Sequence, residues 1–213
     1  MKKILIGIVS IVLIFGSIYL VLSRYEQDSD NLYSTVVLNR TYRNYAEKVN
    51  EKALEYDLPV DYLLALIALE CSGKRIVPHR YEPKVYESLK KVQNKEIESY
   101  DNVNYKKIKD LSDKELKELA SSWGPFQLMG YKSFELKCKI TDISGSKAIA
   151  TGIRWIDITY GNLLRKKKYK DAFHIHNTGR KYPLIGPPRT FHKNYVPQGL
   201  KYMESFKLKA QSN

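Results

Sequence analysis

The sequence predicts a mainly α-helical domain that follows a single N-terminal transmembrane helix. Residues 4–22 form an uncharged run that is long enough to cross a bilayer as a helix. Two later stretches, residues 42–56 and 149–163, carry apolar side chains at intervals of three and four residues, which is the helical period. No stretch shows the strict alternation of apolar and polar residues that is typical of strands.

Residues 1–23 are interpreted as a membrane anchor that is not cleaved. Lys2 and Lys3 precede the uncharged run and acidic residues follow it, so the positive-inside rule places the rest of the chain outside the cytoplasm. A cleaved signal peptide is the alternative, although such a peptide usually has a shorter apolar core, and residues 21–23 match a cleavage site only weakly. We therefore expect a single-pass protein of the cytoplasmic membrane whose main domain is extracytoplasmic, on the periplasmic or cell-wall side.

The chain of 213 residues carries a formal net charge of +13. After the first 24 residues it still has 33 basic and 23 acidic groups, a surplus of ten positive charges. A surplus of this size favours an anionic partner, and the plain alternative is a solvated, lysine-rich surface. Nucleic acid, anionic lipid and anionic cell-wall polymer all carry suitable charge. The predicted topology argues against nucleic acid, because the main domain would not meet it outside the cytoplasm.

Residue types that bind metals are sparse. The four histidines stand at positions 79, 174, 176 and 192, and no CxxC or HExxH spacing occurs, so we expect no metal site. Cys71 and Cys138 would lie in a compartment that permits a disulfide, but two cysteines in a domain of this size need not pair. Their pairing and the oligomeric state stay open.

The main domain is expected to span residues 32–213, after a polar linker over residues 24–31. Its first helix begins at Leu32 and has one apolar stripe, made by Tyr42, Tyr45, Ala46, Val49, Ala53 and Tyr56. Pro59 suits the first turn of the next helix, where its missing N–H is not needed. That helix is apolar on nearly every side and ends at Glu70, which is typical of a buried core helix.

The second half of the domain is less uniform. Residues 74–110 are the least regular stretch, with two prolines and many charges. Ser112 to Glu115 forms a capping box that opens a short helix. The expected elements after it are a turn flanked by aromatic residues over 121–130, a long helix over 149–163, a buried helix over 171–176, a loop around 186–188 and a short amphipathic segment over 195–206.

Glu70 is the candidate catalytic residue. A carboxyl group that closes an apolar helix lies in a low-dielectric environment, so desolvation should raise its pKa. A carboxylic acid that stays protonated near neutral pH can serve as a general acid. The alternative is a Glu at a helix end that is turned to solvent, and Glu70 by itself would favour that alternative.

Three sequence blocks, which occur in a fixed order, favour the catalytic interpretation of Glu70 over the solvent-exposed one. They are residues 56–73 around Glu70, residues 123–129 with the sequence Trp-Gly-Pro-Phe-Gln-Leu-Met, and residues 174–179 with the sequence His-Ile-His-Asn-Thr-Gly. Together they resemble the lytic transglycosylase and goose-type lysozyme family, over about residues 50–206. The resemblance implies a lysozyme-like fold in which Glu70 is the catalytic residue and a Gly-x-x-Gln turn lies beside the cleft.

Three polar or small residues of these blocks are then candidates for binding the substrate. Gly124 would let the backbone approach a sugar closely. Gln127 offers two donors and an acceptor for hydroxyl and N-acetyl groups, or else ties down the turn. Asn177, in a block similar to Tyr-Asn-x-Gly, would hold a substrate carbonyl or cap its helix.

The aromatic residues Trp123, Phe126 and Tyr131 would offer flat faces to pyranose rings or pack in the core. Two positions depart from the family pattern: Cys71 stands where Ser usually follows the catalytic Glu, and His176 stands where Tyr usually precedes the Asn. The imidazole of His176 could hydrogen-bond to the carboxyl group of the acid. If charged, it would lower the pKa of that group and weaken it as an acid.

A second carboxylate is Glu82. The run Arg80-Tyr81-Glu82-Pro83 is similar to an element of some lysozyme-like muramidases, so Tyr81 and Glu82 join the candidate substrate-binding residues. Glu82 would then face the cleft. The alternative is a surface residue that pairs with Arg80 or Lys84.

The activity that the resemblance implies is cleavage of the β-1,4 bond between N-acetylmuramic acid and N-acetylglucosamine in peptidoglycan, without a cofactor. Attack by the muramyl C6 hydroxyl needs one acid/base and gives a 1,6-anhydro product, so we expect a lytic transglycosylase. Attack by water, helped by Glu82, would make a hydrolytic muramidase. A non-catalytic wall-binding domain is a further alternative, which Cys71 and His176 keep open. The expected partners are glycan strands and the membrane.

Overall fold

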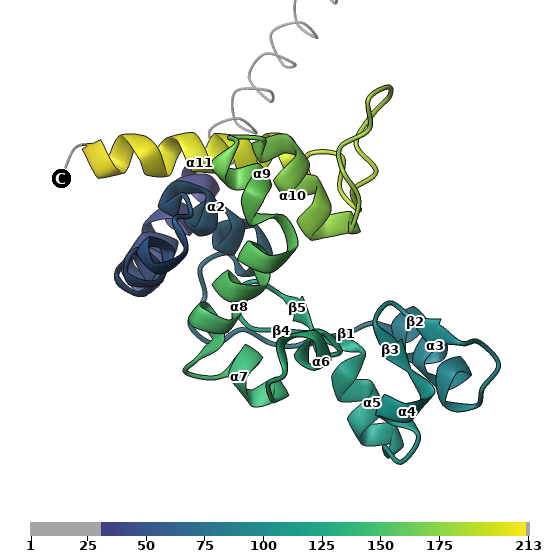
Figure 1. Cartoon of the computed structure of the whole chain (residues 1–213). Coiled ribbons are helices and arrows are strands. Elements are labelled where there is room, and N and C mark those ends of the chain that lie inside the picture. Colours follow the sequence, from purple (N-terminus) through teal and green to yellow (C-terminus); the bar gives the residue numbers. More distant parts are fainter. Residues whose placement is uncertain (1–30, 212–213) are drawn as a thin grey trace, which may run out of the picture.

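The computed structural model describes residues 31–211, of which 64% lie in helices and 6% in strands (Figure 1). The prediction of a mainly α-helical chain is confirmed. The predicted anchor over residues 1–23 and most of the predicted linker lie outside the described residues. Within residues 31–211, none of the helices is long and apolar enough to cross a membrane.

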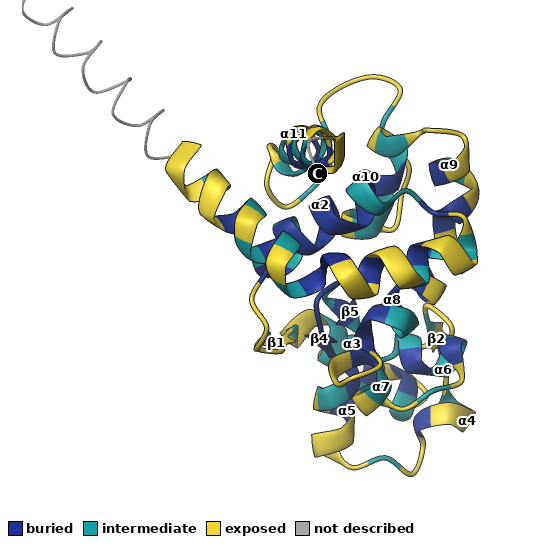
Figure 2. Cartoon of the chain, turned by 90° about the vertical axis from the view of Figure 1, so that its left-hand side faces the viewer, coloured by how far each residue is buried: buried dark blue, intermediate teal, exposed yellow. Residues whose placement is uncertain are grey.

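Two helices build the centre of the larger core. Residues 31–56 form one continuous helix, and its predicted stripe buries Val49 and Ala53. The chain then turns at Asp57, whose φ is +50°. Helix α2 (Val60–Cys71) follows Pro59 and is buried along most of its length, which confirms the prediction of a core helix (Figure 2).

The end of α2 is fixed by the backbone. Ser72 adopts the left-handed conformation with φ +52°, and its N–H donates to the carbonyl of Ala68. Gly73 follows with φ +68°, and a Cβ atom there would lie 2.3 Å from Oγ1 of Thr41. Only glycine fits this approach to the first helix. Glu70 is thereby held in the last turn of α2.

A smaller lobe follows, with a core of its own. It contains α3 (Pro83–Gln93), the hairpin β2 (Ser99–Tyr100) and β3 (Val103–Asn104), α4 (Tyr105–Ile108) and α5 (Asp113–Leu119). Its buried residues are Leu89, Val92, Val103, Ile108, Leu116, Leu119 and Ala120. The predicted capping box is present, since the hydroxyl of Ser112 accepts the N–H of Glu115 at 3.3 Å.

Residues 74–110 were predicted to be the least regular stretch of the chain. This prediction is wrong for residues 83–93, which form the regular helix α3. Pro83 takes the first turn of this helix, where it displaces no hydrogen bond. Val85, Leu89 and Val92 follow at intervals of four and three residues and contact the small core. The sequence contains this helical spacing, but the many charged residues between the three positions make the helix hard to recognise.

Three short antiparallel strands join the two lobes in the order β1 (Arg80–Tyr81), β4 (Ser121–Trp123) and β5 (Leu128–Met129). Arg80 lies opposite Ser122, which in turn lies opposite Met129. Strands of two or three residues are too short to show an alternating pattern, which explains why the sequence did not predict them. Residues 124–127 form the loop between β4 and β5.

The rest of the chain is helical and returns to the large core. It comprises α6 (Lys132–Leu136), α7 (Ile140–Ser144), α8 (Ala148–Ile156), the π-helical turn η1 (Asp157–Gly161), α9 (Asn162–Arg165), α10 (Tyr169–Thr178) and α11 (Tyr195–Gln211). The predicted single helix over 149–163 is interrupted in η1, where Tyr160 has φ −148°. Helix α11 is longer than the predicted segment and packs along α2 (Figure 1).

The two cysteines do not pair. Cys71 is buried and Cys138 is half-buried, and both are free thiols. The thiol of Cys71 lies 3.3 Å from the carbonyl oxygen of Ile67, one turn back along α2. Cys71 therefore acts as a small buried side chain of the core.

Candidate active site

Glu70 lies at the point where α2, α10 and α11 meet. Its side chain is only 16% exposed, and the carboxyl group accepts a hydrogen bond from the hydroxyl of Tyr195, at the start of α11. Gly199, one turn further along α11, allows this approach, since a Cβ atom there would lie 2.9 Å from Phe173 and 3.0 Å from Leu69. The close packing of α11 on α2 thus places a phenol over the carboxyl group of Glu70.

The environment raises the pKa of Glu70 from 4.5 to about 7. Burial is the largest cause, because it penalises the charged carboxylate. The hydrogen bond from Tyr195 and the positive charge of Arg80 act in the opposite direction and keep the pKa from rising further. Near neutral pH the group therefore passes readily between its acid and base forms, as a general acid/base must.

His176 stands beside Glu70 but does not bond to it. Its Nε2 atom lies 3.8 Å from the carboxyl oxygen of Glu70 and 3.0 Å from the carbonyl oxygen of Phe126. Its Nδ1 atom lies 2.7 Å from the hydroxyl of Tyr160. These partners suit a neutral imidazole that donates from Nε2 to Phe126 and accepts at Nδ1 from Tyr160.

Burial lowers the pKa of His176 from 6.5 to about 4, so the ring is neutral at neutral pH. The sequence left open that a charged imidazole would depress the pKa of Glu70 or that His176 would hydrogen-bond to it. Neither effect is present. The hydroxyl that contacts Glu70 comes instead from Tyr195, which was predicted only to begin a short amphipathic segment.

We expect Tyr195→Phe to raise the pKa of Glu70, because the lost hydrogen bond favours the carboxylate. If Glu70 acts as a general acid, the alkaline limb of the pH profile of kcat/KM should move to higher pH, with a rate loss of about tenfold for the removal of one charge-assisted hydrogen bond. Tyr202→Phe, on the same helix, is the control. An unchanged alkaline limb in Tyr195→Phe would contradict this arrangement.

A groove of about 580 Å³ runs between α10, the β4–β5 hairpin and the small lobe. The candidate residues that line it are Glu82, Gln127, His176 and Asn177, together with Arg80 and Tyr131. Glu70 is not part of the lining itself. Its carboxyl oxygen lies 3.8 Å from Nε2 of His176, which does line the groove.

The loop between β4 and β5 holds two of the candidate residues in unusual backbone conformations. Gly124 has φ +71°, and a Cβ atom there would lie 2.2 Å from the carbonyl oxygen of Ile143, so this glycine is required by the approach of the loop to α7. Gln127 has φ +48°. Its side-chain carbonyl accepts from Ser122 at 2.8 Å and its amide donates to the carbonyl of Gly124 at 3.1 Å. Gln127 ties down the turn, and one of its two amide hydrogens remains for a ligand.

The aromatic residues that were predicted either to contact sugar rings or to pack in the core lie in different parts of the structure. Phe126 is 1% exposed and packs against Gly152, so its ring belongs to the core. Trp123 and Tyr81 lie outside the groove, in a separate hollow of about 510 Å³ that also contains His79. The rings of His79 and Trp123 stack with centroids 4.6 Å apart. Tyr131 is half-buried at the groove.

Asn177 and Glu82 both reach the groove, from opposite walls. Asn177 is exposed at the end of α10, and its side-chain oxygen accepts the backbone N–H of Phe191 at 3.3 Å. Glu82 pairs with Arg80 at 2.6 Å and precedes the first residue of α3. The pairing with Arg80 and the position in the groove, predicted as alternatives, are both present.

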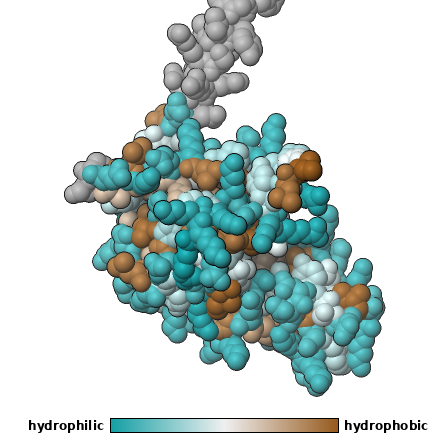
Figure 3. Space-filling model, turned by 45° about the horizontal axis from the view of Figure 1, so that its top comes forward, coloured by the Kyte–Doolittle hydropathy of each residue, from teal (hydrophilic) through white to brown (hydrophobic). Residues whose placement is uncertain are grey.

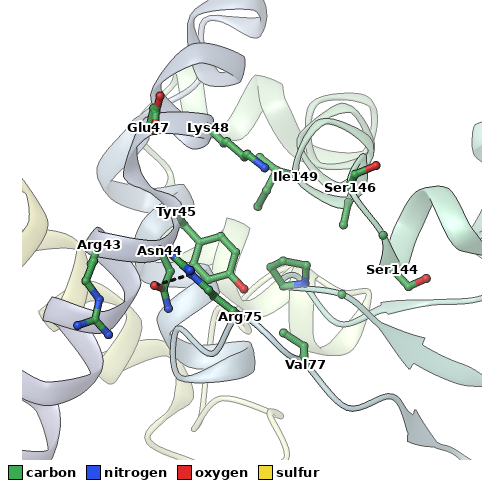
Figure 4. Close-up of a pocket in the computed structure, with 14 residues that line it drawn as sticks. Arg43, Asn44, Tyr45, Glu47, Lys48, Arg75, Val77, Ser144, Ser146 and Ile149 are labelled. Carbon is green, nitrogen blue, oxygen red and sulfur yellow. Dashed lines mark hydrogen bonds between the residues drawn. The ribbon is translucent and has the colours of Figure 1, made fainter.

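A second pocket, of about 360 Å³, lies on the other side of the 124–127 loop and shares no residue with the groove (Figure 4). Three basic residues, Arg43, Lys48 and Arg75, line it; the side chain of Lys48 reaches towards Ile149, whereas that of Glu47 points away from the other residues drawn. Arg75 donates to the side-chain oxygen of Asn44 at 3.1 Å. The surface of this pocket is therefore polar and positively charged.

Within residues 31–211, no group of three or more His, Cys, Asp or Glu side chains lies close enough to hold a metal ion. Compared with known proteins, the chain matches no family model, no curated protein and no solved structure.

Proposed function

We propose that this protein cleaves the β-1,4 bond between N-acetylmuramic acid and N-acetylglucosamine in peptidoglycan, and that its domain has a lysozyme-like fold. The observation that carries the proposal is the environment of Glu70. A carboxyl group at the end of a buried helix, with a pKa of about 7 and a groove beside it, suits the protonation of a glycosidic oxygen. No metal or organic cofactor is required.

The chemistry is non-hydrolytic transglycosylation, for which one acid/base is sufficient. Protonated Glu70 gives its proton to the leaving oxygen as the bond from C1 of the muramyl residue to that oxygen breaks. The C6 hydroxyl of the same muramyl residue then attacks C1 and loses its proton to the Glu70 carboxylate. The products are a 1,6-anhydro end and a free 4-hydroxyl group, and Glu70 is protonated again. No water is consumed.

The walls of the groove support this assignment. The side-chain nitrogen of Asn177 makes no hydrogen bond within the described part of the chain, and Gln127 keeps one amide hydrogen free. Both amides can donate to the carbonyl groups of N-acetyl substituents. Because His176 is neutral, it does not weaken Glu70 as an acid, which removes one reason to regard the domain as non-catalytic.

The direct test is digestion of purified peptidoglycan by the full chain, followed by mass spectrometry of the products. Anhydro ends differ from reducing ends by one water, so the spectrum distinguishes transglycosylase from hydrolase. We expect anhydro ends only. Binding of the protein to peptidoglycan without any cleavage would contradict the proposal and leave a wall-binding domain.

The second candidate is a hydrolytic muramidase, and the observation that favours it is the position of Glu82 in the groove. Its carboxylate is fixed by Arg80 at 2.6 Å and could orient an attacking water. In that case the product carries a reducing end.

Glu82→Gln separates the two mechanisms. The substitution leaves the charge of Arg80 uncompensated, so the pKa of Glu70 should fall and the alkaline limb of the pH profile should move to lower pH. We expect a moderate loss of rate, about tenfold, from this shift and from weaker substrate positioning. A loss as complete as that of Glu70→Gln, with reducing ends as the only products of the wild-type protein, would show the hydrolase to be correct.

The cellular location is part of the proposal. Peptidoglycan lies outside the cytoplasmic membrane, which agrees with the anchor expected over residues 1–23 and with an extracytoplasmic main domain. Fractionation of cells should recover the full-length chain in the membrane. A mature protein that begins near Arg24 in a soluble fraction would instead indicate a cleaved signal.

A further inference from the structure

The loop that joins α10 to α11, residues 180–194, displays large apolar side chains to solvent. Leu184, Ile185 and Phe191 are 103%, 93% and 85% exposed. Single exposed apolar residues are common on protein surfaces, but here two adjacent ones, Leu184 and Ile185, lie in a loop that projects from the molecule (Figure 1); we call this pair the apolar tip. Figure 3 shows a group of hydrophobic side chains that projects from a hydrophilic surface on this side of the molecule.

The base of the loop is held to the site helix by His174, which is 1% exposed. Its Nε2 atom accepts the backbone N–H of Arg189 at 3.0 Å, and its Nδ1 atom lies 2.6 Å from the carbonyl oxygen of Arg180. Asn177 accepts the N–H of Phe191 further along. Three prolines, at positions 183, 187 and 188, restrict the backbone between these points. The loop is therefore fixed at its base and presents its apolar tip away from the core.

The charges that the loop itself carries have one sign. Between Ala172 and Met203 the sequence contains no Asp or Glu. The basic residues of the loop are Arg180, Lys181, Arg189 and Lys193, all exposed and without an ion pair within the described residues. An apolar tip with basic residues around it is complementary to a layer whose outer face is anionic and whose interior is apolar.

The tip and the N-terminal end of the described chain lie at the same end of the molecule, the top in Figures 1 and 2. Residues 23–30 separate the predicted span over residues 4–22 from residue 31, and eight residues reach at most about 28 Å. If the span is inserted in a bilayer, the loop is therefore kept near the same surface. The apolar tip and the basic residues of the loop do not depend on the span, so the loop can contact a membrane with or without it.

We propose that residues 180–194 form a membrane-contact loop, in which Leu184 and Ile185 enter the interface of an anionic phospholipid bilayer and the four basic residues contact its headgroups. A glycan is a poor occupant for this tip, because sugar recognition needs hydrogen-bonding side chains that Leu and Ile do not have. The contact would fix the orientation of the groove relative to the membrane, because Asn177 belongs to both the groove and the base of the loop. The inference does not require the proposed chemistry.

The test places a tryptophan in the loop of the full chain. Ile185→Trp and Leu54→Trp both replace exposed aliphatic side chains, and Leu54 is 82% exposed near the far end of the first helix. That helix rises about 1.5 Å per residue, so position 54 lies about 35 Å from residue 31 along it. Each variant is combined with vesicles of phosphatidylcholine and phosphatidylglycerol whose acyl chains carry bromine, and the emission of the unchanged chain, with its two tryptophans, is subtracted.

We expect the added emission of Ile185→Trp to be blue-shifted and at least halved by the brominated chains, and that of Leu54→Trp to stay unquenched. Adding Lys181→Gln and Lys193→Gln to the Ile185→Trp variant should reduce the quenching, and vesicles of phosphatidylcholine alone should do the same. Equal quenching at positions 185 and 54, or none at position 185, would overturn the proposal whether or not residues 4–22 anchor the chain. Peptidoglycan digestion by the same variants reports separately on the proposed function.

Discussion

Glu70→Gln is expected to lower the rate of peptidoglycan cleavage by about 10²–10⁴-fold. Gln has nearly the same shape and can still accept the hydrogen bond from Tyr195, but it cannot give up and regain a proton. Both halves of the proposed reaction depend on that proton, since Glu70 first donates it to the leaving oxygen and then receives one from the C6 hydroxyl. Binding of the glycan in the groove should be kept.

The measurement is the release of anhydro-muropeptides from purified peptidoglycan by the full-length variant. Glu87→Gln is the matched control, because Glu87 is an exposed residue of α3. It should cleave at the wild-type rate. If Glu70→Gln cleaves nearly as fast as the wild-type protein, Glu70 is not the acid/base and the proposed function fails with it.

The same substitution is expected to stabilise the folded protein above neutral pH. The pKa of Glu70 is raised from 4.5 to about 7 on folding. Between these two values the unfolded chain loses its proton while the folded protein keeps it, so stability falls as the pH rises from about 4.5 to 7. The pKa difference corresponds to about 3 kcal/mol, and Gln has no charge to bury.

Urea denaturation of the wild-type protein and of Glu70→Gln at pH 4.5 and pH 8 measures this effect. The two proteins should have similar free energies of unfolding at pH 4.5, and the variant should be more stable by about 3 kcal/mol at pH 8. Glu87→Gln should follow the wild-type protein at both pH values. A constant difference between Glu70→Gln and the wild-type protein would mean that Glu70 does not bury a charge.

The two expectations together describe a residue that is placed for chemistry at the cost of stability. An apolar residue or an amide at position 70 would suit the core better than an ionisable group does. The raised pKa of Glu70 and the neutral state of His176 have the same cause, which is burial between α2, α10 and α11. In both side chains the uncharged form is favoured.

Much of the large core could be predicted from the sequence, because it depends on local patterns. The apolar run of α2, the Pro at its start and the Gly73 stop are features of one helix, and they already placed Glu70 in the last turn. The capping box of α5 is equally local. The short strands and the break in the helix at Tyr160 were not predictable in this way, because they are set by contacts between distant segments.

By itself, the sequence determined that the described chain is mainly helical and that a carboxyl group closes its most apolar helix. Only the tertiary structure decided what surrounds that group. Tyr195 stands 125 residues from Glu70 and reaches it because Gly199 lets α11 approach α2. It also decided that Phe126 packs in the core and that Gly124 is needed against Ile143. A helical period encodes which face of an element is buried, but not which side chains of other elements meet it, and the chemistry of Glu70 depends on those side chains.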